Sequence, residues 1–320
     1  MNYYLGVDGG GTKTKFILCD TKGKEIASSL QGTSHYWQCG LNGVKTVMEK
    51  GLLDCVQQAN IDIGEIVYVF AAVGGYGDIE EDAPKIFEKA QAGLHNLPLS
   101  MGNDTENALA GSFAGKPGIN LIAGTGSIGL GKNENGDSAR SGGWGGDFGG
   151  DEGSAFWLGK NLLLLFSRQS DHRDKQTKLY TYLKEQMKWS LDSEVLSECV
   201  VEWKFDRTKI AGLAKYVFAL AEMGDAPAIK LFHQASQELK EIAIAIKKQL
   251  QLPNQTPVSY SGGVFNAKKF VLEPLKLLLE KEGLCLQDPI LTPDKGSVIL
   301  AMQKNKLTIT EDIIENLKAS

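Results

Sequence analysis

The sequence lacks the patterns that mark several common classes of protein. Its 320 residues carry a formal net charge of −5, so we expect no nucleic acid and no membrane as a partner, because both favour a basic protein surface. Its five cysteines are scattered and contain no C-x-x-C pair, which gives no sign of a disulfide framework, a zinc site or an iron–sulfur cluster. No apolar run approaches the roughly 20 residues of a membrane-spanning helix.

Two common nucleotide-binding motifs are also missing. The chain has neither G-x-x-x-x-G-K-[ST] nor a helix-opening G-x-G-x-x-G after a strand, which argues against a P-loop and a dinucleotide-binding fold. The first expected strand begins directly after Met1-Asn2, so we expect no signal peptide and a cytoplasmic location. A hydrophobic content of 42% and a charged content of 23% are ordinary for a globular protein, and the length favours two domains.

Glycine is abundant at residues 9–11, and the rest of the chain can be interpreted around this stretch. Three consecutive glycines separate two apolar runs, which predicts a strand, a tight turn and a second strand. Glycine lets backbone N–H groups approach a ligand closely. Consecutive N–H groups form a nest for an anion, and Thr12 and Thr14 add hydroxyl donors. Asp8 is placed to hold a cation that accompanies phosphates. The alternative is a hairpin that merely turns the chain.

The same pattern recurs about 115 residues later. We expect a strand at 119–123, a glycine and hydroxyl turn at 124–127, and a return strand at 128–131. Two such units predict a duplicated domain, with two phosphate-holding hairpins that face each other across a cleft.

Three further positions have both a structural and a functional interpretation. Asp104 follows an expected strand at 97–101 and opens an expected helix, so it either caps that helix or has a chemical role. Trp37 lies in an expected loop, where it either anchors the loop or stacks on the flat face of a sugar. Asp151 follows six glycines between residues 142 and 150, and it either caps the next helix or binds sugar hydroxyls.

The remaining pattern predicts alternating strands and helices. His172 and His233 stand alone and are interpreted as surface or packing residues. We expect strands at 25–30, 66–73 and 258–260, helices at 43–59, 80–92, 155–166, 207–221, 225–250 and 311–317, and a short helix after 292–298.

These motifs, in this order, resemble those of a known family. The sequences at 8–12, 103–104, 124–127, 142–145 with 151–154, and 262–263 occur in the order seen in N-acetylglucosamine kinases. More broadly the chain resembles the BadF/BadG/BcrA/BcrD ATPase family of the actin-like sugar-kinase superfamily, over roughly residues 3–303.

The resemblance implies an α/β fold. We expect two ribonuclease-H-like (actin-like ATPase) domains, each a mixed five-stranded sheet with flanking helices, around a central cleft. The expected ranges are 1–115, with the phosphate hairpin and sugar loop, and 116–320, a larger domain with a helical insert. Whether the last helix packs back on the first domain is left open.

The resemblance also implies an enzyme that uses ATP and Mg²⁺ to phosphorylate the 6-hydroxyl of N-acetylglucosamine. Asp104 matches the catalytic base, and Asp8 matches a position that holds Mg²⁺ through water. The implied ATP-binding residues are Gly10, Gly11, Thr12, Lys13, Gly124, Thr125, Gly126, Ala211, Gly262 and Gly263. The implied sugar-binding residues are His35, Trp37, Asp104, Ser127, Gly143, Trp144, Gly145 and Asp151.

Two departures from the family pattern border the sugar site. His35 stands where mammalian N-acetylglucosamine kinases have Asn, and the segment from Trp144 to Asp151 is one residue longer. Both changes favour a site that also admits N-acetylmuramic acid, whose lactyl carboxylate His35 could meet. This would place the chain in salvage of murein sugars. Some bacterial relatives accept both sugars.

Other functions of the same family remain open alternatives. One is an ATPase activator of a CoA-ester reductase or dehydratase, which the scattered cysteines argue against. Another is a different amino-sugar kinase, such as a glucosamine kinase. A non-catalytic sugar sensor is disfavoured by Asp104 together with both phosphate turns. The expected partners are an amino sugar and ATP, and a homodimer is left open.

Overall fold

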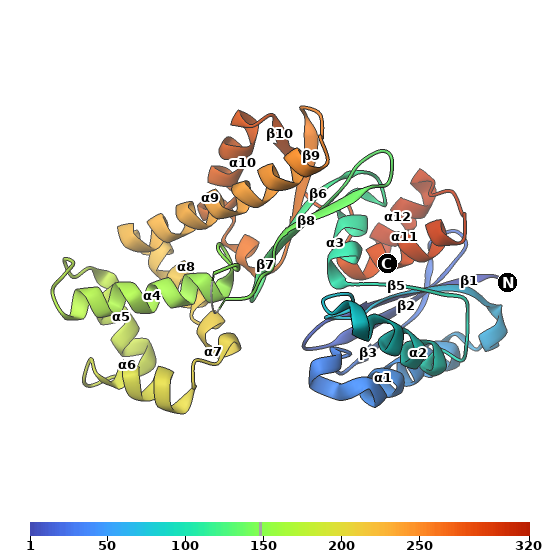
Figure 1. Cartoon of the computed structure of the whole chain (residues 1–320), viewed down its shortest axis with the longest axis horizontal. Helices are drawn as coiled ribbons and strands as arrows, with labels where there is room; N and C mark the ends of the chain where they lie inside the picture. Colours follow the sequence, from blue (N-terminus) through green and yellow to red (C-terminus); the bar gives the residue numbers. More distant parts are fainter. Residues whose placement is uncertain (147–148) are drawn as a thin grey trace. The chain divides into compact units, whose positions relative to one another are not determined.

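The computed structural model describes residues 1–146 and 149–320. Asp147 and Phe148, in the glycine-rich run, lie outside the described residues. The chain forms two compact units, one made of residues 1–118 with 288–320 and the other of residues 119–287. Each unit is built around its own sheet (Figure 1).

The first unit contains a mixed sheet with the order β3-β2-β1-β4-β5 in the residues described. Neighbouring strands β1, β2 and β3 are antiparallel, whereas β4 and β5 run parallel to β1. Successive side chains of β1 point to opposite faces of the sheet. Leu5 and Val7 pack in one buried cluster, and Tyr4 packs in another. The strands are β1 (Tyr3–Gly9), β2 (Thr14–Asp20), β3 (Glu25–Gln31), β4 (Ile66–Ala72) and β5 (Leu99–Gly102).

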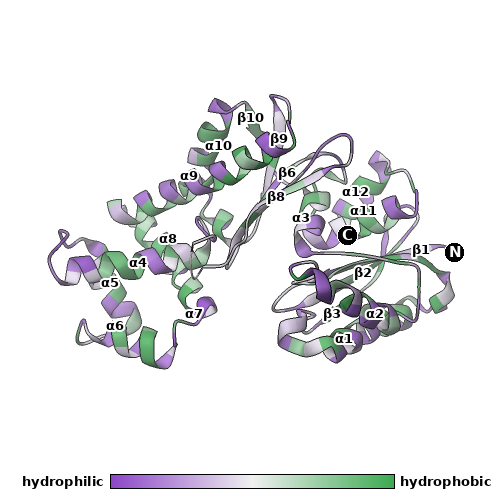
Figure 2. Cartoon of the chain, viewed as in Figure 1, coloured by the Kyte–Doolittle hydropathy of each residue, from purple (hydrophilic) through white to green (hydrophobic). Residues whose placement is uncertain are grey.

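Helices cover both faces of this sheet (Figure 1). Residues of α1 and α2 pack with Leu5 and Val7, and residues of α11 and α12 pack with Tyr4 on the other face. Figure 2 shows hydrophobic and hydrophilic residues alternating along α1, the pattern of a helix with one buried face. The helices are α1 (Tyr36–Ala59), α2 (Ala83–Gly93), α3 (Asp104–Phe113), α11 (Pro293–Lys304) and α12 (Glu311–Ala319), with short 3₁₀ segments η1 (Ile63–Glu65) and η2 (Glu80–Asp82).

The second unit repeats the strand order of the first. Its sheet has the order β10-β9-β6-β7-β8, so that β6 to β10 correspond in turn to β1 to β5. This confirms the duplication predicted from the two glycine turns, and with it the expected α/β fold class of two mixed five-stranded sheets, within the part of the chain described. The strands are β6 (Gly118–Ala123), β7 (Ser127–Lys132), β8 (Ser138–Gly142), β9 (Thr256–Ser261) and β10 (Leu284–Leu286).

The region between β8 and β9 is helical and carries much of the core of this unit. Leu162, Phe166, Leu220, Phe232 and Leu239 are buried in one cluster with Leu121 and Val258 of the sheet. The helical elements of the second unit are α4 (Ala155–Ser170), α5 (Lys178–Met187), α6 (Glu194–Leu196), the π-helix η3 (Ser197–Glu202), α7 (Arg207–Ala211), α8 (Ala214–Glu222), α9 (Ala226–Gln249), the 3₁₀ segment η4 (Gly263–Phe270) and α10 (Leu272–Lys281).

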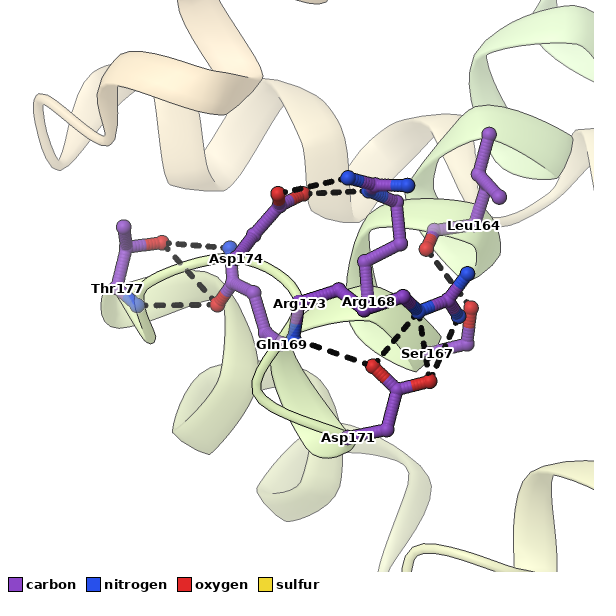
Figure 3. A network of polar contacts seen from close by, with 8 residues as sticks. All are labelled: Leu164, Ser167, Arg168, Gln169, Asp171, Arg173, Asp174 and Thr177. Atoms are coloured by element: carbon purple, nitrogen blue, oxygen red, sulfur yellow. Dashed lines mark hydrogen bonds and ion pairs between the residues drawn. The ribbon is translucent and has the colours of Figure 1, made fainter.

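A polar network fixes the corner between α4 and α5 (Figure 3). Arg168 donates from Nε and Nη2 to the two carboxylate oxygens of Asp174, at 2.7 and 2.9 Å. The side chain of Gln169 accepts from the backbone N–H of Thr177 at 3.0 Å, and Asp171 pairs with Arg173. These contacts link the end of α4 to the segment that leads into α5.

Several expected elements differ in their limits. The helix expected at 43–59 begins at Tyr36 and includes a kink at Gly40, where φ is 69°. The helix expected at 207–221 is two helices, because the chain turns at 212–213. The segment expected to precede a short helix is itself helical from Pro293, since proline suits the first turn of a helix. The last helix begins after Thr310, whose hydroxyl accepts from Ile313 N as its cap.

The C-terminal segment belongs to the first compact unit. The expected range of 116–320 for the second domain therefore differs from the observed division, which returns 288–320 to the first unit. Val298 and Ile299 of α11, and Leu317 of α12, are buried with Tyr4 and Ile17 of the first sheet. Burial of this apolar surface explains the return of the chain.

Candidate functional site

The first glycine turn has the predicted strand–turn–strand form. Gly10 N donates to Lys13 O at 3.0 Å, and Thr33 Oγ1 donates to Gly10 O at 2.9 Å. Gly9 has no room for a side chain, because a Cβ there would lie 2.7 Å from Ala72 O. Thr12 and Lys13 are exposed at the tip, whereas Thr14 is buried in β2 and its hydroxyl has no partner among the described residues. Thr12, and not Thr14, thus offers an accessible hydroxyl.

Asp8 lies at the end of β1 with an incompletely compensated negative charge. Asn107 of α3 donates from Nδ2 to Asp8 Oδ1 at 2.8 Å and to Val7 O at 3.2 Å. Burial is the largest cause that raises the pKa of the Asp8 carboxyl group, and the charges of Asp294 and Asp104 add to it, while the Asn107 hydrogen bond lowers it; together they give a pKa of about 6. Asp294 has its own cation, because Lys15 Nζ lies 2.5 Å from it.

The surroundings of Asp8 fit a hydrated divalent cation. Asn107 turns its amide N–H groups toward Asp8 and Val7, and its Oδ1 is buried with no hydrogen-bond donor among the described residues. The described residues contain no group of three or more His, Cys, Asp or Glu side chains that could hold a metal. A single carboxylate such as Asp8 can hold Mg²⁺ when water and phosphate oxygens complete its shell.

Asp104 is the first residue of α3 and does not cap it. Asn103 is the cap, since its side-chain oxygen accepts from Thr105 N at 3.2 Å. The capping interpretation of Asp104 is therefore wrong. Asp104 is exposed to solvent, yet the surrounding protein displaces bulk water and raises the pKa of its carboxyl group. The charge of Asp78 also raises this pKa, while nearby backbone N–H groups and His35 lower it.

Of the two aromatic residues at the start of α1, Tyr36 is buried and Trp37 is exposed. Tyr36 is the buried member and donates its hydroxyl to Asp82 Oδ2 at 3.2 Å. Trp37 is 60% exposed, so the alternative in which Trp37 anchors the loop is wrong. The ring of His35 lies 5.3 Å from that of Trp37. His35 also packs against Gly74, where a Cβ would lie 3.0 Å from its ring, and its buried Nδ1 has no partner among the described residues.

In the second unit the turn at 124–127 is joined to the start of α4. Ala155 N donates to Gly124 O at 2.9 Å and Phe156 N donates to Thr125 O at 3.2 Å. The hydroxyl of Ser127 donates to Glu152 O at 2.7 Å. The first free N–H groups of α4 are thereby satisfied by the turn, and the Ser127 hydroxyl has a partner within the protein.

Asp151 is held by the turn and by an arginine that sequence reasoning missed. Its Oδ1 accepts from Ser127 N at 3.1 Å, and its Oδ2 pairs with Arg207 Nη2. The cap of α4 is Ser154, whose hydroxyl accepts from Trp157 N at 3.1 Å, so the capping interpretation of Asp151 is wrong. No motif signals Arg207, because it lies 56 residues away along the chain.

The segment 143–145 holds an exposed indole between two glycines. Gly143 and Gly145 have φ of 71° and 90°, a conformation that favours glycine. Gly143 N donates to Ser127 O at 2.9 Å, which ties this segment to the turn at 124–127. Trp144 is 68% exposed, and the guanidinium carbon of Arg140 lies 5.7 Å from its ring centroid.

The residues that we expect to contact the nucleoside lie around the turn at 124–127. Gly262 has φ of 104°, and a Cβ there would lie 3.0 Å from Gly124 N. The neighbouring Gly263 has open space where a side chain would be. Ala211 is packed with Phe156, whose N–H donates to Thr125 O of the turn. The structure therefore brings together the predicted residues of the second unit at 124–127, 211 and 262–263.

Comparison with known proteins agrees with the fold and the motifs. An N-acetyl-D-glucosamine kinase of Dictyostelium discoideum is 27% identical over 320 residues, covering 95% of this chain and 98% of the relative. An N-acetylmuramic acid/N-acetylglucosamine kinase of Clostridium acetobutylicum is 27% identical over 280 residues, covering 87% and 90%. A solved structure from Chromobacterium violaceum has the same fold, with a TM-score of 0.71 at 24% identity, covering 94% of this chain and 99% of that one.

Two further observations complete the description. In the part of the chain described, every helix is too short or too polar to cross a membrane. A family model matches residues 5–301, which include the glycine turns, Asp104 and the sugar loop. The chain belongs to the BadF/BadG/BcrA/BcrD ATPase family.

Proposed function

We propose that this protein is an ATP-dependent amino-sugar kinase that phosphorylates the 6-hydroxyl of N-acetylglucosamine. The observation that carries the proposal is the placement of Asp104, an accessible carboxyl group with a raised pKa, in the same unit as the Asp8 hairpin. Two relatives that match most of the chain carry the names of N-acetylglucosamine kinases, one of which also acts on N-acetylmuramic acid by its name.

Asp104 would act as the general base. A sugar hydroxyl is a weak nucleophile at neutral pH, and a carboxylate within hydrogen-bond reach accepts its proton as the bond to phosphorus forms, which contributes about 10²–10⁴-fold in rate. A raised pKa makes the carboxylate a stronger base, provided that it remains ionised at the working pH. Its position on the first turn of α3 fixes its backbone, because Asn103 caps that helix.

The two glycine turns would bind the phosphates of ATP. Gly11, Thr12 and Lys13 would offer backbone donors, a hydroxyl and a cation at an accessible tip, and Gly10, whose N–H donates to Lys13 O, would shape the turn. Gly124, Thr125 and Gly126 offer the second turn, with Ala211 and Gly262-Gly263 at the nucleoside. Mg²⁺, when bound near Asp8 through water, would neutralise charge on the phosphate oxygens. Asp8 and Asn107 would orient its water shell.

The residues proposed to bind the sugar include two exposed tryptophans and two carboxylates. His35, Trp37 and Asp104 belong to the first unit, and Ser127, Gly143, Trp144, Gly145 and Asp151 to the second. The exposed ring faces of Trp37 and Trp144 suit stacking on a pyranose. We extend the proposal to N-acetylmuramic acid, whose carboxylate would meet His35, and thus to murein sugar salvage.

The test is a coupled ADP-release assay with Mg-ATP and a panel of amino sugars. We expect ADP release that requires N-acetylglucosamine or N-acetylmuramic acid, and that is lost in Asp104→Asn. Asp171→Asn is a matched control, because Asp171 is an exposed carboxylate in the surface network of Figure 3. ADP release that is independent of every sugar in the panel would overturn the proposal and favour an ATPase activator.

A further inference from the structure

Arg207 is the cation that the structure places against the second phosphate turn. A Cβ added to Gly126 would lie 2.7 Å from Arg207 Nη2 and 2.7 Å from Asp151 Oδ1. The absence of a side chain at Gly126 thus allows the guanidinium and the carboxylate to lie directly against the backbone of the turn. Neither charge is present in the turn's own sequence, which consists of glycine and hydroxyl residues.

The two partners in this ion pair have different access to solvent. The side chain of Asp151 is 3% exposed, whereas that of Arg207 is 44% exposed. A guanidinium group has five N–H donors in a planar fork. Asp151 is its ion-pair partner within the described residues, so the group retains donors on its accessible side. A buried carboxylate needs one fixed cation, and this cation can also serve a second anion.

The backbone of α7 gives Arg207 a fixed base. Asp206 caps this helix by accepting from Lys209 N at 2.8 Å. Gly159 of α4 lies against Ile210 O without room for a Cβ, so α7 is closely packed on α4. Arg207 and Ala211 are four residues apart and share one face of α7. The face that carries Arg207 is therefore the face expected at the nucleoside.

We propose that Arg207 is a phosphate-binding residue of this enzyme. One edge of its guanidinium holds Asp151, and its remaining N–H groups contact phosphate oxygens of the nucleotide bound at Gly124–Ser127. Arginine suits this task because its planar donors match phosphate oxygens and its charge persists at any physiological pH. The inference rests on the proposed function, since it takes the nucleotide to be ATP or ADP.

The competing role is purely structural, in which Arg207 only holds Asp151 in place. Calorimetric titration with ADP and with adenosine separates the two roles when Arg207 is replaced in an Asp151→Asn background. No unpaired carboxylate then remains beside the turn, and the two ligands share the nucleoside and differ in their phosphates. We expect Arg207→Met to weaken ADP binding by about 10- to 100-fold, as for a lost charged hydrogen bond, and to change adenosine binding less than about twofold. Arg168→Met is the matched control, because its ion pair with Asp174 lies in the surface network of Figure 3.

Arg207→Gln is measured in parallel, so that poor folding of one variant leaves the ratio of ADP to adenosine affinity measurable in the other. An unchanged ratio in the folded variant would overturn the inference, and so would a wild-type protein that binds ADP no better than adenosine. Wild-type protein that binds ADP but shows no sugar-dependent ADP release would overturn the proposed kinase function, while the affinity ratio still tests Arg207.

Discussion

The two glycine turns occupy corresponding positions in their sheets but differ in their electrostatic surroundings. In the first unit, loss of contact with bulk water, together with neighbouring acidic groups, raises the pKa of both Asp8 and Asp104. In the second unit, the buried carboxylate Asp151 has a guanidinium partner and a backbone donor. Both turns follow the first strand of a sheet with the same strand order.

The different surroundings of these carboxyl groups suit them to different roles, although the two sheets have the same topology. A carboxyl group without a fixed cation changes its charge readily, and it attracts a proton or a metal ion. A carboxylate paired with arginine keeps its orientation, which suits binding of a hydroxyl group. We therefore expect substitutions in the first unit to alter rate and pH dependence, and substitutions in the second to alter affinity and local packing.

The largest effect is expected for Asp104→Asn. Removal of the base should lower kcat by about 10²–10⁴-fold, while ADP affinity changes little. Steady-state kinetics with N-acetylglucosamine, together with ADP titration, measure both quantities. A loss of kcat smaller than tenfold would show that the carboxylate is not the base and would remove the chemical distinction between the two units.

Asp8→Asn should stabilise the ligand-free protein at neutral pH. Because the pKa of Asp8 is raised to about 6 in the folded state, its ionisation opposes folding above that pH, and this cost vanishes as the pH falls toward its unfolded pKa. We expect a gain of about 2 kcal/mol at pH 7.5, which disappears near pH 4. Urea unfolding at both pH values measures it, and a gain equal at both would contradict the assigned cause.

Gly126→Ala should disturb the second turn more than Gly124→Ala. The new Cβ at Gly126 would lie 2.7 Å from both Arg207 and Asp151, whereas Gly124 has nothing within 4 Å. We expect a loss of about 1–3 kcal/mol for Gly126→Ala, typical of overpacking, and little change for its neighbour. Thermal unfolding compares the two variants. Equal melting temperatures would mean that Arg207 and Asp151 move away from the new methyl group without a loss of stability.

His35→Asn should have the smallest effect, on the choice between sugars. If His35 meets the carboxylate of N-acetylmuramic acid, its loss should lower kcat/KM for that sugar about fivefold more than for N-acetylglucosamine, within the range of a single contact. The two sugars are compared in one ADP-release assay. Equal losses on both would assign His35 to packing against Gly74 and Trp37.

Much of the fold could be predicted from local pattern. The hairpin of β1 and β2, the repeated turn at 124–127 and the cap at Thr310 each depend on neighbours in sequence. The limits of α1 and α11 could not be predicted as well, because tertiary packing extends α1 to Tyr36 and α11 buries Val298 and Ile299. β8 and β10 have weak local signals, since β8 is partly exposed and β10 has three residues.

The sequence by itself determined the two glycine turns, the duplicated strand pattern and the positions of Asp8, Asp104 and Asp151, because these depend on residue type and short spacing. Only the tertiary structure decided how these carboxyl groups are charged and held. Asn107 bonds Asp8 from 99 residues away, and Arg207 pairs with Asp151 from 56 residues away. Electrostatic surroundings depend on distance in space, so that partners without a local motif become visible only after the chain has folded.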